Sequence, residues 1–262
     1  MSHDNRFDLA IIGGGSGGLS LASGTAQLGL KVALIEGHKM GGDCLNYGCV
    51  PSKALLAAAK SIYQARHQAP KFGAELEFKA LDFSKVMGHV SSVVKTIEPH
   101  DSVERFESLG VKVFQEYGQF VDANTIQAGE QTIKAKKIVI ATGSSPFIPP
   151  IKGIDTINYH TNETIFDLKV LPEHLIVIGG GPIGCELAQA FAMLGTKVTI
   201  VEAMTILPKD DKDAVAVVSQ SLKEVGIEIL EDAKVNEVAQ KNEATIEVKV
   251  SKSSEDIVLT GS

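Results

Sequence analysis

The stretch GGDCLNYGCVPSK, residues 41 to 53, holds two cysteines at a spacing that permits redox chemistry. Four residues separate Cys44 from Cys49, and the Pro-Ser-Lys that follows is a typical helix start. A loop-to-helix turn of this length can bring the two Cα atoms within the roughly 7 Å that a disulfide needs. Cys49 would stand at the helix N-terminus, where the dipole and the N–H groups stabilise the reactive thiolate. The pattern therefore predicts a redox-active disulfide.

Two other interpretations of the cysteine pair stay open. A structural zinc site needs four ligands, and neither a second cysteine pair nor a suitably spaced histidine pair follows in the sequence. The two cysteines could also be reduced and purely structural, although a close pair in a chain with three cysteines is more often catalytic or metal-binding. The third cysteine, Cys185, lies among small and apolar residues, and we interpret it as a packing residue. We expect no bound metal.

An internal repeat must position this chemistry. Residues 7 to 36 and 174 to 202 align without a gap from their glycines onward, at a constant offset of 166 residues. Each copy consists of an apolar strand, a glycine turn, a helix of small residues and a second strand that ends in an acid. The matched residues are Gly13, Gly15, Gly18 and Glu36 in the first copy and Gly179, Gly181, Gly184 and Glu202 in the second. The chain therefore holds two copies of one βαβ unit.

The order of these residues fits dinucleotide binding. The first glycine permits a tight turn, the second lets the backbone approach a pyrophosphate, and the third lets helix and strand pack closely. The helix N-terminus faces the phosphates, and the acid accepts hydrogen bonds from a ribose diol. Turns that merely pack are the alternative, but the whole pattern recurs twice. A carboxylate at Glu202 also favours the free 2′-hydroxyl of NAD over the 2′-phosphate of NADP, although the cation Lys209 follows it.

The remaining sequence predicts further elements and a domain boundary. Residues 54 to 67 and 82 to 109 carry helical patterns, the second interrupted near Pro99, and a β-rich stretch follows from 111 to 144. A charged helix near 210 to 225 precedes strands near 227 to 230, 244 to 250 and 256 to 259. The segment PFIPPIKG, residues 146 to 153, is interpreted as a linker because proline neither continues a helix nor joins a central strand.

We therefore expect an α/β fold class with two Rossmann-like domains, each a parallel sheet with helices plus a β meander. The first domain, residues 1 to 149, and the second, residues 150 to 262, would each bind a dinucleotide. Net charge is −7, and neither a basic stripe nor a run of Lys and Arg occurs, so nucleic acid and membrane are poor partners. The polar N-terminus does not resemble a signal peptide, and we expect a cytoplasmic enzyme.

Taken together, these motifs make the chain resemble the class I flavoprotein disulfide oxidoreductases, the family of dihydrolipoamide dehydrogenase, glutathione reductase and mercuric reductase. GGDCLNYGCVPSK is similar to the family's redox-disulfide motif and GGGPIGCELAQAF to its pyridine-nucleotide site. The first glycine turn is similar to its FAD site, and ATGS (141 to 144) to its domain junction. Within the family, the motifs are most similar to those of the mercuric-reductase-like branch and nearly as similar to those of the dihydrolipoamide dehydrogenases. The resemblance implies FAD and NAD as cofactors, with NADP less favoured, and a disulfide, a dithiol or a metal ion as substrate.

Roles for single residues also follow from the resemblance. Cys49 would face the flavin as a charge-transfer thiolate, and Cys44 would be the interchange thiol that attacks the substrate. Lys53 would lie beside the flavin, paired with Glu186, where a cation stabilises the reduced flavin. Without the resemblance, the two would be an ordinary surface lysine and helix-surface acid. The implied cofactor-binding positions are Gly13, Gly15, Ser16, Gly17, Gly18, Glu36, Gly42, Asp43, Cys49, Lys53, Gly118, Ala141, Thr142, Gly143, Gly179, Gly181, Ile183, Glu186 and Glu202.

Family members carry segments that these 262 residues do not match. They are the last strand of the nicotinamide domain, a second FAD motif and an interface domain whose His, with a Glu five positions on, acts as general base across a dimer. None of the seven histidines here has that spacing to a glutamate, and we expect them on the surface or in linkers. The sequence also stops inside an expected β meander. We therefore expect the N-terminal portion of a longer, homodimeric oxidoreductase.

In the resulting hypothesis, hydride passes from NADH to FAD and electrons pass on to a Cys44–Cys49 disulfide, or the reverse with a dithiol donor. One alternative is a truncated, non-catalytic fragment that binds dinucleotides without turnover. A second is a flavin oxidoreductase in which the cysteines take no part.

Overall fold

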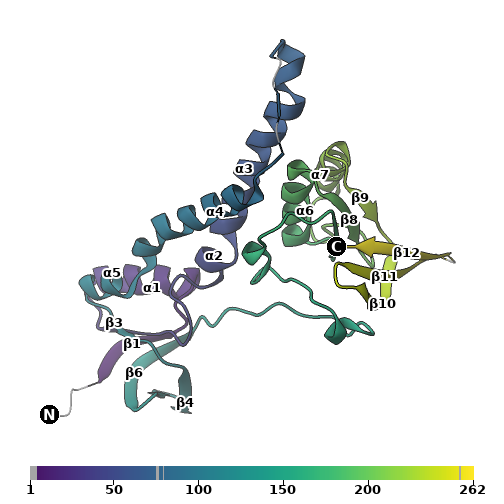
Figure 1. Ribbon diagram of the computed structural model, residues 1–262. Coiled ribbons are helices and arrows are strands. Elements are labelled where there is room, and N and C mark those ends of the chain that lie inside the picture. Colours follow the sequence, from purple (N-terminus) through teal and green to yellow (C-terminus); the bar gives the residue numbers. More distant parts are fainter. Residues whose placement is uncertain (1–4, 75–76, 79, 254) are drawn as a thin grey trace. The chain divides into compact units, whose positions relative to one another are not determined.

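A computed structural model of the chain describes residues 5–74, 77–78, 80–253 and 255–262. The chain falls into two units (Figure 1). One takes Met1–Pro51 and Ser91–Pro146, and the other takes Ser52–Val90 and Phe147–Ser262. The division therefore lies within two helices, α3 (Cys49–His67) and α4 (Phe83–Ile97). The domain limits expected from the sequence, 1 to 149 and 150 to 262, remain a prediction.

The first unit is built on a mixed sheet. Its strands are β1 (Arg6–Ile12), β2 (Val32–Ile35), β3 (Lys112–Phe114), β4 (Gly118–Asp122), β5 (Thr125–Ala128) and β6 (Gln131–Ile140). They lie in the order β3-β2-β1-β6-β5-β4, with β3, β2, β1 and β6 parallel and β5 and β4 antiparallel. Strand β6 therefore ends the antiparallel meander and also pairs with β1 in the parallel part, which carries the glycine turn.

Both faces of the parallel part are buried, which explains its nearly continuous apolar strands. Helices α1 (Ser16–Gln27) and α5 (Val103–Ser108) cover one face, where Leu19 and Phe106 pack with Leu9 and Ile11 of β1 (Figure 1). The alternate residues of β1 and the apolar residues of β5 form the core on the other face. Two short helices, α2 (Gly42–Asn46) and η2 (Glu98–Asp101), also belong to this unit. The glycine turn after β1 is thus set on a strand with a buried environment on both sides.

The second unit combines a parallel and an antiparallel sheet. Its elements after the linker are η3 (Ile154–Thr156), η4 (Ile165–Asp167), β7 (His174–Ile178), α6 (Pro182–Leu194), β8 (Lys197–Val201), α7 (Lys212–Glu224), β9 (Glu228–Leu230), β10 (Ala233–Asn242), β11 (Thr245–Lys252) and β12 (Glu255–Gly261). Strands β7, β8 and β9 are parallel, and β10, β11 and β12 form an antiparallel meander. The meander buries its valines against Val201 and Leu230 of the parallel strands. In Figure 1, α6 lies on the other side of those strands.

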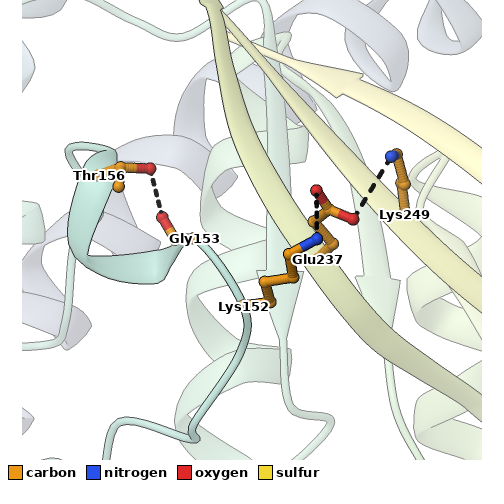
Figure 2. A network of polar contacts seen from close by, with 5 residues as sticks. All are labelled: Lys152, Gly153, Thr156, Glu237 and Lys249. Carbon is orange, nitrogen blue, oxygen red and sulfur yellow. Dashed lines mark hydrogen bonds and ion pairs between the residues drawn. The ribbon is translucent and has the colours of Figure 1, made fainter.

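The linker is fixed at its end to the meander. Lys152 forms a β-bridge with Glu237 of β10, and its carbonyl accepts a hydrogen bond from the N–H of Val238 at 2.9 Å. The Nζ of Lys152 also lies 3.4 Å from a Glu237 carboxylate oxygen, and Lys249 approaches the other oxygen at 3.4 Å (Figure 2). Gly153 follows in the left-handed conformation, with φ of 86°, where a side chain would overlap the Val238 carbonyl. The linker is therefore anchored to the second unit from Lys152 onward.

The observed elements confirm the predicted α/β class and most of the expected helices and strands. Helix α3 covers the helix expected at 54 to 67, and the pattern at 82 to 109 is divided into α4, η2 and α5 at the predicted interruption. Strand β10 was missed by sequence reasoning. It is the first strand of the meander, so the described meander has three strands rather than the two that the alternating sequence indicated.

Candidate functional site

The first glycine turn joins β1 to α1 and is tightly enclosed. Gly13 adopts φ of 114°, which favours glycine, and its N–H donates to the Ile35 carbonyl at 2.8 Å. A side chain at Gly13 would overlap the carbonyl oxygen of Ala141, whose own N–H donates to Ile12 at 2.8 Å. The same side-chain carbon added at Gly13 would lie 3.1 Å from the backbone nitrogen of Thr142. Ala141 and Thr142 therefore pack directly against the glycine turn.

Helix α1 starts directly from this turn. Gly15 is its N-cap and supplies no side chain, and Ser16, Gly17 and Gly18 begin its first turn. A side chain at Gly18 would overlap the Gly13 carbonyl, so only glycine permits this approach of helix to strand. An N-terminus of this kind presents N–H groups and a positive dipole end to an anion.

The second glycine turn has the same construction. Gly179 adopts φ of 108°, and its N–H donates to the Val201 carbonyl at 2.9 Å. Gly181 is the N-cap of α6, and a side chain at Gly184 would overlap the Gly179 carbonyl. Pro182 stands at the first helical position, where its missing N–H costs the helix no internal hydrogen bond. Both turns therefore have the close backbone approach that the sequence repeat predicts.

The two acids hold their own turns in place. Glu36 accepts from the N–H of Gly14 at 2.5 Å and from that of His38 at 2.7 Å. Glu202 accepts from the N–H of Gly180 at 2.7 Å and from that of Met204 at 2.9 Å. Each carboxylate oxygen has further lone pairs, so these bonds fix the direction of the acid and leave it able to accept a hydroxyl.

The likeness of the copies extends beyond the acids. The Gly14 carbonyl accepts from the N–H of Gly41 at 2.9 Å, and the Gly180 carbonyl accepts from that of Leu207 at 2.9 Å. The two donors are again 166 residues apart, and both have a left-handed backbone, with φ of 85° at Gly41 and 48° at Leu207. Sequence reasoning stopped at the acids, because glycine and leucine show no resemblance. The same 166-residue offset, continued for five residues beyond Glu36, pairs Gly41 with Leu207.

The redox segment is a tight turn between two helices. Cys44 lies in α2, and Cys49 is the first residue of α3. At Gly48, an added side-chain carbon would lie 3.0 Å from the Asp43 carbonyl oxygen and 3.4 Å from the Cys44 Cα. A larger residue here would push against this backbone, so glycine suits the close turn that brings Cys49 back beside Cys44.

The two cysteines are reduced thiols that lie next to one another. Cys49 is exposed, and Cys44 is partly buried and hydrogen-bonded to the Cys49 side chain. Burial, together with the adjoining Cys49 and the charge of Asp101, raises the pKa of the Cys44 thiol. The predicted proximity of the pair is confirmed, whereas the disulfide bond remains a prediction.

Lys53 and Glu186 form an ion pair in the second unit. The Lys53 ammonium lies 2.7 Å from both oxygens of the Glu186 carboxylate, and the lysine side chain is 63% exposed. Lys53 stands four residues after Cys49 in α3, and Glu186 lies in the second turn of α6. The pairing implied by the resemblance is confirmed. Contact of the pair with a flavin remains a prediction.

Two further contacts hold α3 and α4 to α6 in the same unit. The guanidinium of Arg66 donates to the Leu194 carbonyl at the end of α6, at 3.4 Å. The ring centroids of Phe83 and Phe191 lie 6.2 Å apart. The position of Lys53 along α6 is therefore set by packing as well as by its charge.

The remaining predicted positions are spread over the two units. Gly42 packs on the first turn, since an added side-chain carbon would lie 2.6 Å from the Gly15 Cα. Gly118 begins β4 among isoleucine side chains, and Gly143 follows β6 with φ of 67°. Ile183 is 60% exposed in the first turn of α6. Cys185 is buried beneath this turn, as expected of a packing residue, and burial raises its pKa to about 11.

The expectation that all histidines lie on the surface or in linkers is wrong for His174. It begins β7, half-buried, and its ring contacts the Thr260 carbonyl at 2.6 Å and the Thr199 hydroxyl at 2.9 Å. Burial and the charge of Lys197 lower its pKa, and the hydrogen bond to the Thr260 carbonyl and the charge of Glu228 partly oppose this shift. His3 lies outside the described residues.

Neither a membrane-spanning helix nor a metal-binding cluster occurs in the part of the chain that the structure describes. Among residues 5–74, 77–78, 80–253 and 255–262, no helix is long and apolar enough to cross a bilayer. Within the same described ranges, no three His, Cys, Asp or Glu side chains gather in a way that could hold a metal ion.

Both turns suit the phosphates of a dinucleotide. In each, glycine Cα atoms leave space where a side chain would block the backbone, and a helix N-terminus follows. A carboxylate fixed to the middle glycine stands at the ribose position. The residues of both turns therefore fit the phosphates and ribose of a dinucleotide such as FAD or a pyridine nucleotide.

Comparison with known proteins agrees with this geometry. A family model described as pyridine nucleotide-disulphide oxidoreductase matches residues 7–261. Dihydrolipoyl dehydrogenase of Acholeplasma laidlawii is 36% identical over 239 residues, which cover 89% of this chain and 70% of that protein. Mercuric reductase of Lysinibacillus sphaericus is 33% identical over 242 residues, 92% of this chain and 44% of that protein.

A solved structure is similar over nearly the whole chain. The HOCl-induced flavoprotein disulfide reductase RclA from Escherichia coli superposes with a TM-score of 0.78 at 29% identity, covering 96% of this chain and 54% of that chain. The chain thus spans 70% of the first relative and about half of the other two.

Proposed function

Because the chain belongs to the pyridine nucleotide-disulphide oxidoreductase family, we propose that it transfers electrons between NAD(P)H, FAD and a Cys44–Cys49 disulfide. One observation carries the proposal: the cysteine pair is built onto the first of two matching dinucleotide turns. Gly41, which precedes the cysteine segment, donates to the turn at Gly14. A redox pair attached to a flavin site in this way is placed to exchange electrons with it.

The chain's own residues would divide the work as follows. The first turn and Glu36 would bind FAD, and the second turn and Glu202 would bind the pyridine nucleotide. FAD, when bound, would supply the chemistry that links a two-electron hydride donor to a disulfide. The ammonium of Lys53, held by Glu186, would stabilise negative charge that develops on the reduced cofactor.

Cys44 and Cys49 would store the electron pair. A disulfide that accepts two electrons and two protons becomes two thiols, and the S–S bond breaks. Cys44 would keep its proton at neutral pH because burial and its neighbour raise its pKa. Cys49, at the N-terminus of α3, is where a thiolate would be stabilised by the helix dipole.

Several finer points belong to the same proposal. NAD is favoured over NADP because the Glu202 carboxylate, held by Gly180 and Met204, would repel a 2′-phosphate. The substrate would be a disulfide, a dithiol or a metal ion, as the names of the relatives indicate. A homodimer is proposed for the full-length form, and the cytoplasm remains the expected compartment.

The test counts thiols before and after NADH. The oxidised, FAD-loaded protein is treated with NADH without oxygen, denatured, and titrated with a thiol reagent. Two additional thiols are expected in the wild type, and none in Cys44→Ser or Cys49→Ser. Protein that binds NADH without FAD would support a non-catalytic fragment. Flavin reduction with no new thiols would support chemistry without the cysteines, and either result would overturn the proposal.

A further inference from the structure

Tyr117 presents an exposed aromatic ring beside the acid of the first dinucleotide site. Its side chain is 76% exposed, in the loop between β3 and β4. The ring nevertheless lies against the backbone of Gly37, the residue after Glu36. A side-chain carbon added at Gly37 would lie 2.5 Å from Cδ1 and 2.7 Å from Cγ of the ring. Glycine at this position is therefore what allows the ring to lie there.

The surroundings of Tyr117 keep its ring out of the protein core. Phe114, three residues before Tyr117, is buried. Gly118, the residue after Tyr117, packs among isoleucines, and a side-chain carbon added there would lie 3.2–3.5 Å from side-chain atoms of Ile12, Ile35 and Ile126. The chain is thus anchored on both sides of the loop. The tyrosine ring between these anchors has one side on Gly37 and most of its surface exposed, an arrangement that suits stacking with a planar ligand.

The order of groups in the first site indicates which ligand group would come here. Phosphates belong at the turn from Gly13 to Gly18, and the ribose belongs at Glu36, whose direction is fixed by its bond to Gly14. The base is attached to the ribose, so a base that extends past the acid would reach Gly37, the next residue in the chain. We infer that Tyr117 stacks on the adenine base of the dinucleotide bound in the first site, an inference that rests on the proposed function.

The second copy differs at both positions, which limits the inference to the first site. Gly37 is matched by Ala203 in the second copy. The Cβ of an alanine at this position would occupy the space that the Tyr117 ring takes up against Gly37 in the first copy. The backbone N–H groups of the two acids donate equivalent bonds to the carbonyls of Phe114 and Leu230, so the residue three positions on is Tyr117 in the first copy and Ala233 in the second. Ala233 is buried, with 1% of its surface exposed. An aromatic platform for the base is therefore a feature of the FAD site.

The composition of the chain supplies a direct probe. It has no tryptophan and four tyrosines, so its intrinsic fluorescence comes from tyrosine alone. Stacking of adenine on Tyr117 should quench that residue's share of the emission. We expect ADP to quench the emission of the apoprotein, whereas inorganic pyrophosphate, which lacks a base, should not. The quench should disappear in Tyr117→Phe and persist in the control Tyr159→Phe.

Affinity provides the second readout. Tyr117→Ala should raise the Kd of FAD, measured by flavin fluorescence, by about tenfold, whereas Tyr117→Phe should leave it within about twofold. NADH affinity should stay unchanged in both variants, which also reports that they are folded. If the wild type binds FAD and ADP but neither the quench nor the Kd depends on residue 117, this inference is overturned and the proposed function stands. If the wild type binds no adenine nucleotide in its first site, both are overturned.

Discussion

Lys53 and Glu186 are 133 residues apart in the chain, yet the lysine ammonium lies 2.7 Å from both carboxylate oxygens of the glutamate. An exposed ion pair of this kind contributes about 1 kcal/mol or less to folding. The lysine side chain is 63% exposed, so stability alone gives little reason for so well-formed a pair. A functional role for the pair can therefore be separated from a structural one by experiment.

We predict that Lys53→Met slows NADH-dependent flavin reduction by about a hundredfold while the melting temperature changes little. The physical reason is the loss of a fixed positive charge where negative charge develops. Stopped-flow bleaching of the flavin absorbance measures the rate, and thermal unfolding measures stability. Lys60→Met, an exposed lysine on the same helix, is the matched control and should retain the wild-type rate. Equal rates in the two variants would exclude the role proposed for Lys53.

Local patterns account for most of what the sequence predicted correctly. A glycine turn, its helix and its acid lie within about 25 residues, and each has its own steric reason, as at Gly13 and Gly18. Strand β10 was missed because its sequence, AKVNEVAQKN, ends in three polar residues, interrupts the apolar alternation with polar residues and needs β11 to define its register. The Lys53–Glu186 pairing came from the family resemblance, since charge alone does not identify a partner 133 residues away.

Other features depend on contacts that no local pattern records. Leucine seldom adopts a positive φ, so the left-handed Leu207 and its match to Gly41 were not expected. His174 was assigned to the surface because its partners, Thr199 and the Thr260 carbonyl, are contributed by strands far along the chain. Both cases required the tertiary fold, in which distant strands meet.

The third glycine of each turn allows a reciprocal test of the two sites. A side chain at Gly18 would overlap the Gly13 carbonyl, and one at Gly184 would overlap the Gly179 carbonyl. Gly18→Ala should weaken FAD binding at least about tenfold and leave NADH binding intact, and Gly184→Ala should do the reverse. Equilibrium titrations of both ligands with both variants give the four affinities.

The control for the glycine pair is Gly24→Ala in α1. Apart from its chain neighbours and the nearby backbone of its own helix, an added carbon there would meet no atom of the described residues within 4 Å. Alanine also favours a helix interior over glycine by roughly 0.5–1 kcal/mol. Gly24→Ala should therefore bind both ligands normally and unfold at a slightly higher temperature. The assignment of one cofactor to each turn would be contradicted if either Gly18→Ala or Gly184→Ala weakened both ligands equally while remaining folded.

The three thiols should react with an alkylating reagent in a fixed order. In the reduced protein, Cys49 is exposed, Cys44 is partly buried with a raised pKa, and burial raises the pKa of Cys185 to about 11. We predict that the alkylation rate of Cys44 reaches half its maximum at a pH above 9.0, the ordinary pKa of a thiol, because the thiolate is the reactive form. Cys185 should stay unlabelled near neutral pH until urea unfolds the protein. Mass spectrometry of peptides after timed labelling gives each rate.

Removing the neighbouring thiol tests the cause of the shift at Cys44. Burial is the largest cause and remains in Cys49→Ala, whereas the contribution of the adjoining side chain is lost. The pH midpoint for Cys44 should therefore fall in Cys49→Ala but stay above 9.0. A midpoint that does not move would mean that the two side chains do not interact in solution.

His174 should make the stability of the protein depend on pH. Its pKa lies below the usual 6.5 because burial and the charge of Lys197 disfavour the imidazolium, although the hydrogen bond to the Thr260 carbonyl and the charge of Glu228 act in the opposite direction. Below pH 6.5 the unfolded chain binds a proton at this residue more readily than the folded protein does. The contribution of His174 to the free energy of unfolding is thus fully present above pH 6.5. It is lost as the pH falls below 6.5 and through the lower pKa of the folded state.

We predict that the free energy of unfolding falls less steeply between pH 7.5 and pH 5 in His174→Asn than in the wild type. Asparagine keeps a donor for the Thr260 carbonyl but cannot titrate, so the difference between the two slopes isolates the imidazole. Urea unfolding followed by circular dichroism at a series of pH values supplies both slopes. His160→Asn, which makes the same replacement at an exposed histidine, is the matched control. Parallel slopes for His174→Asn and the wild type would mean that His174 takes up its proton equally well in the folded and unfolded chains.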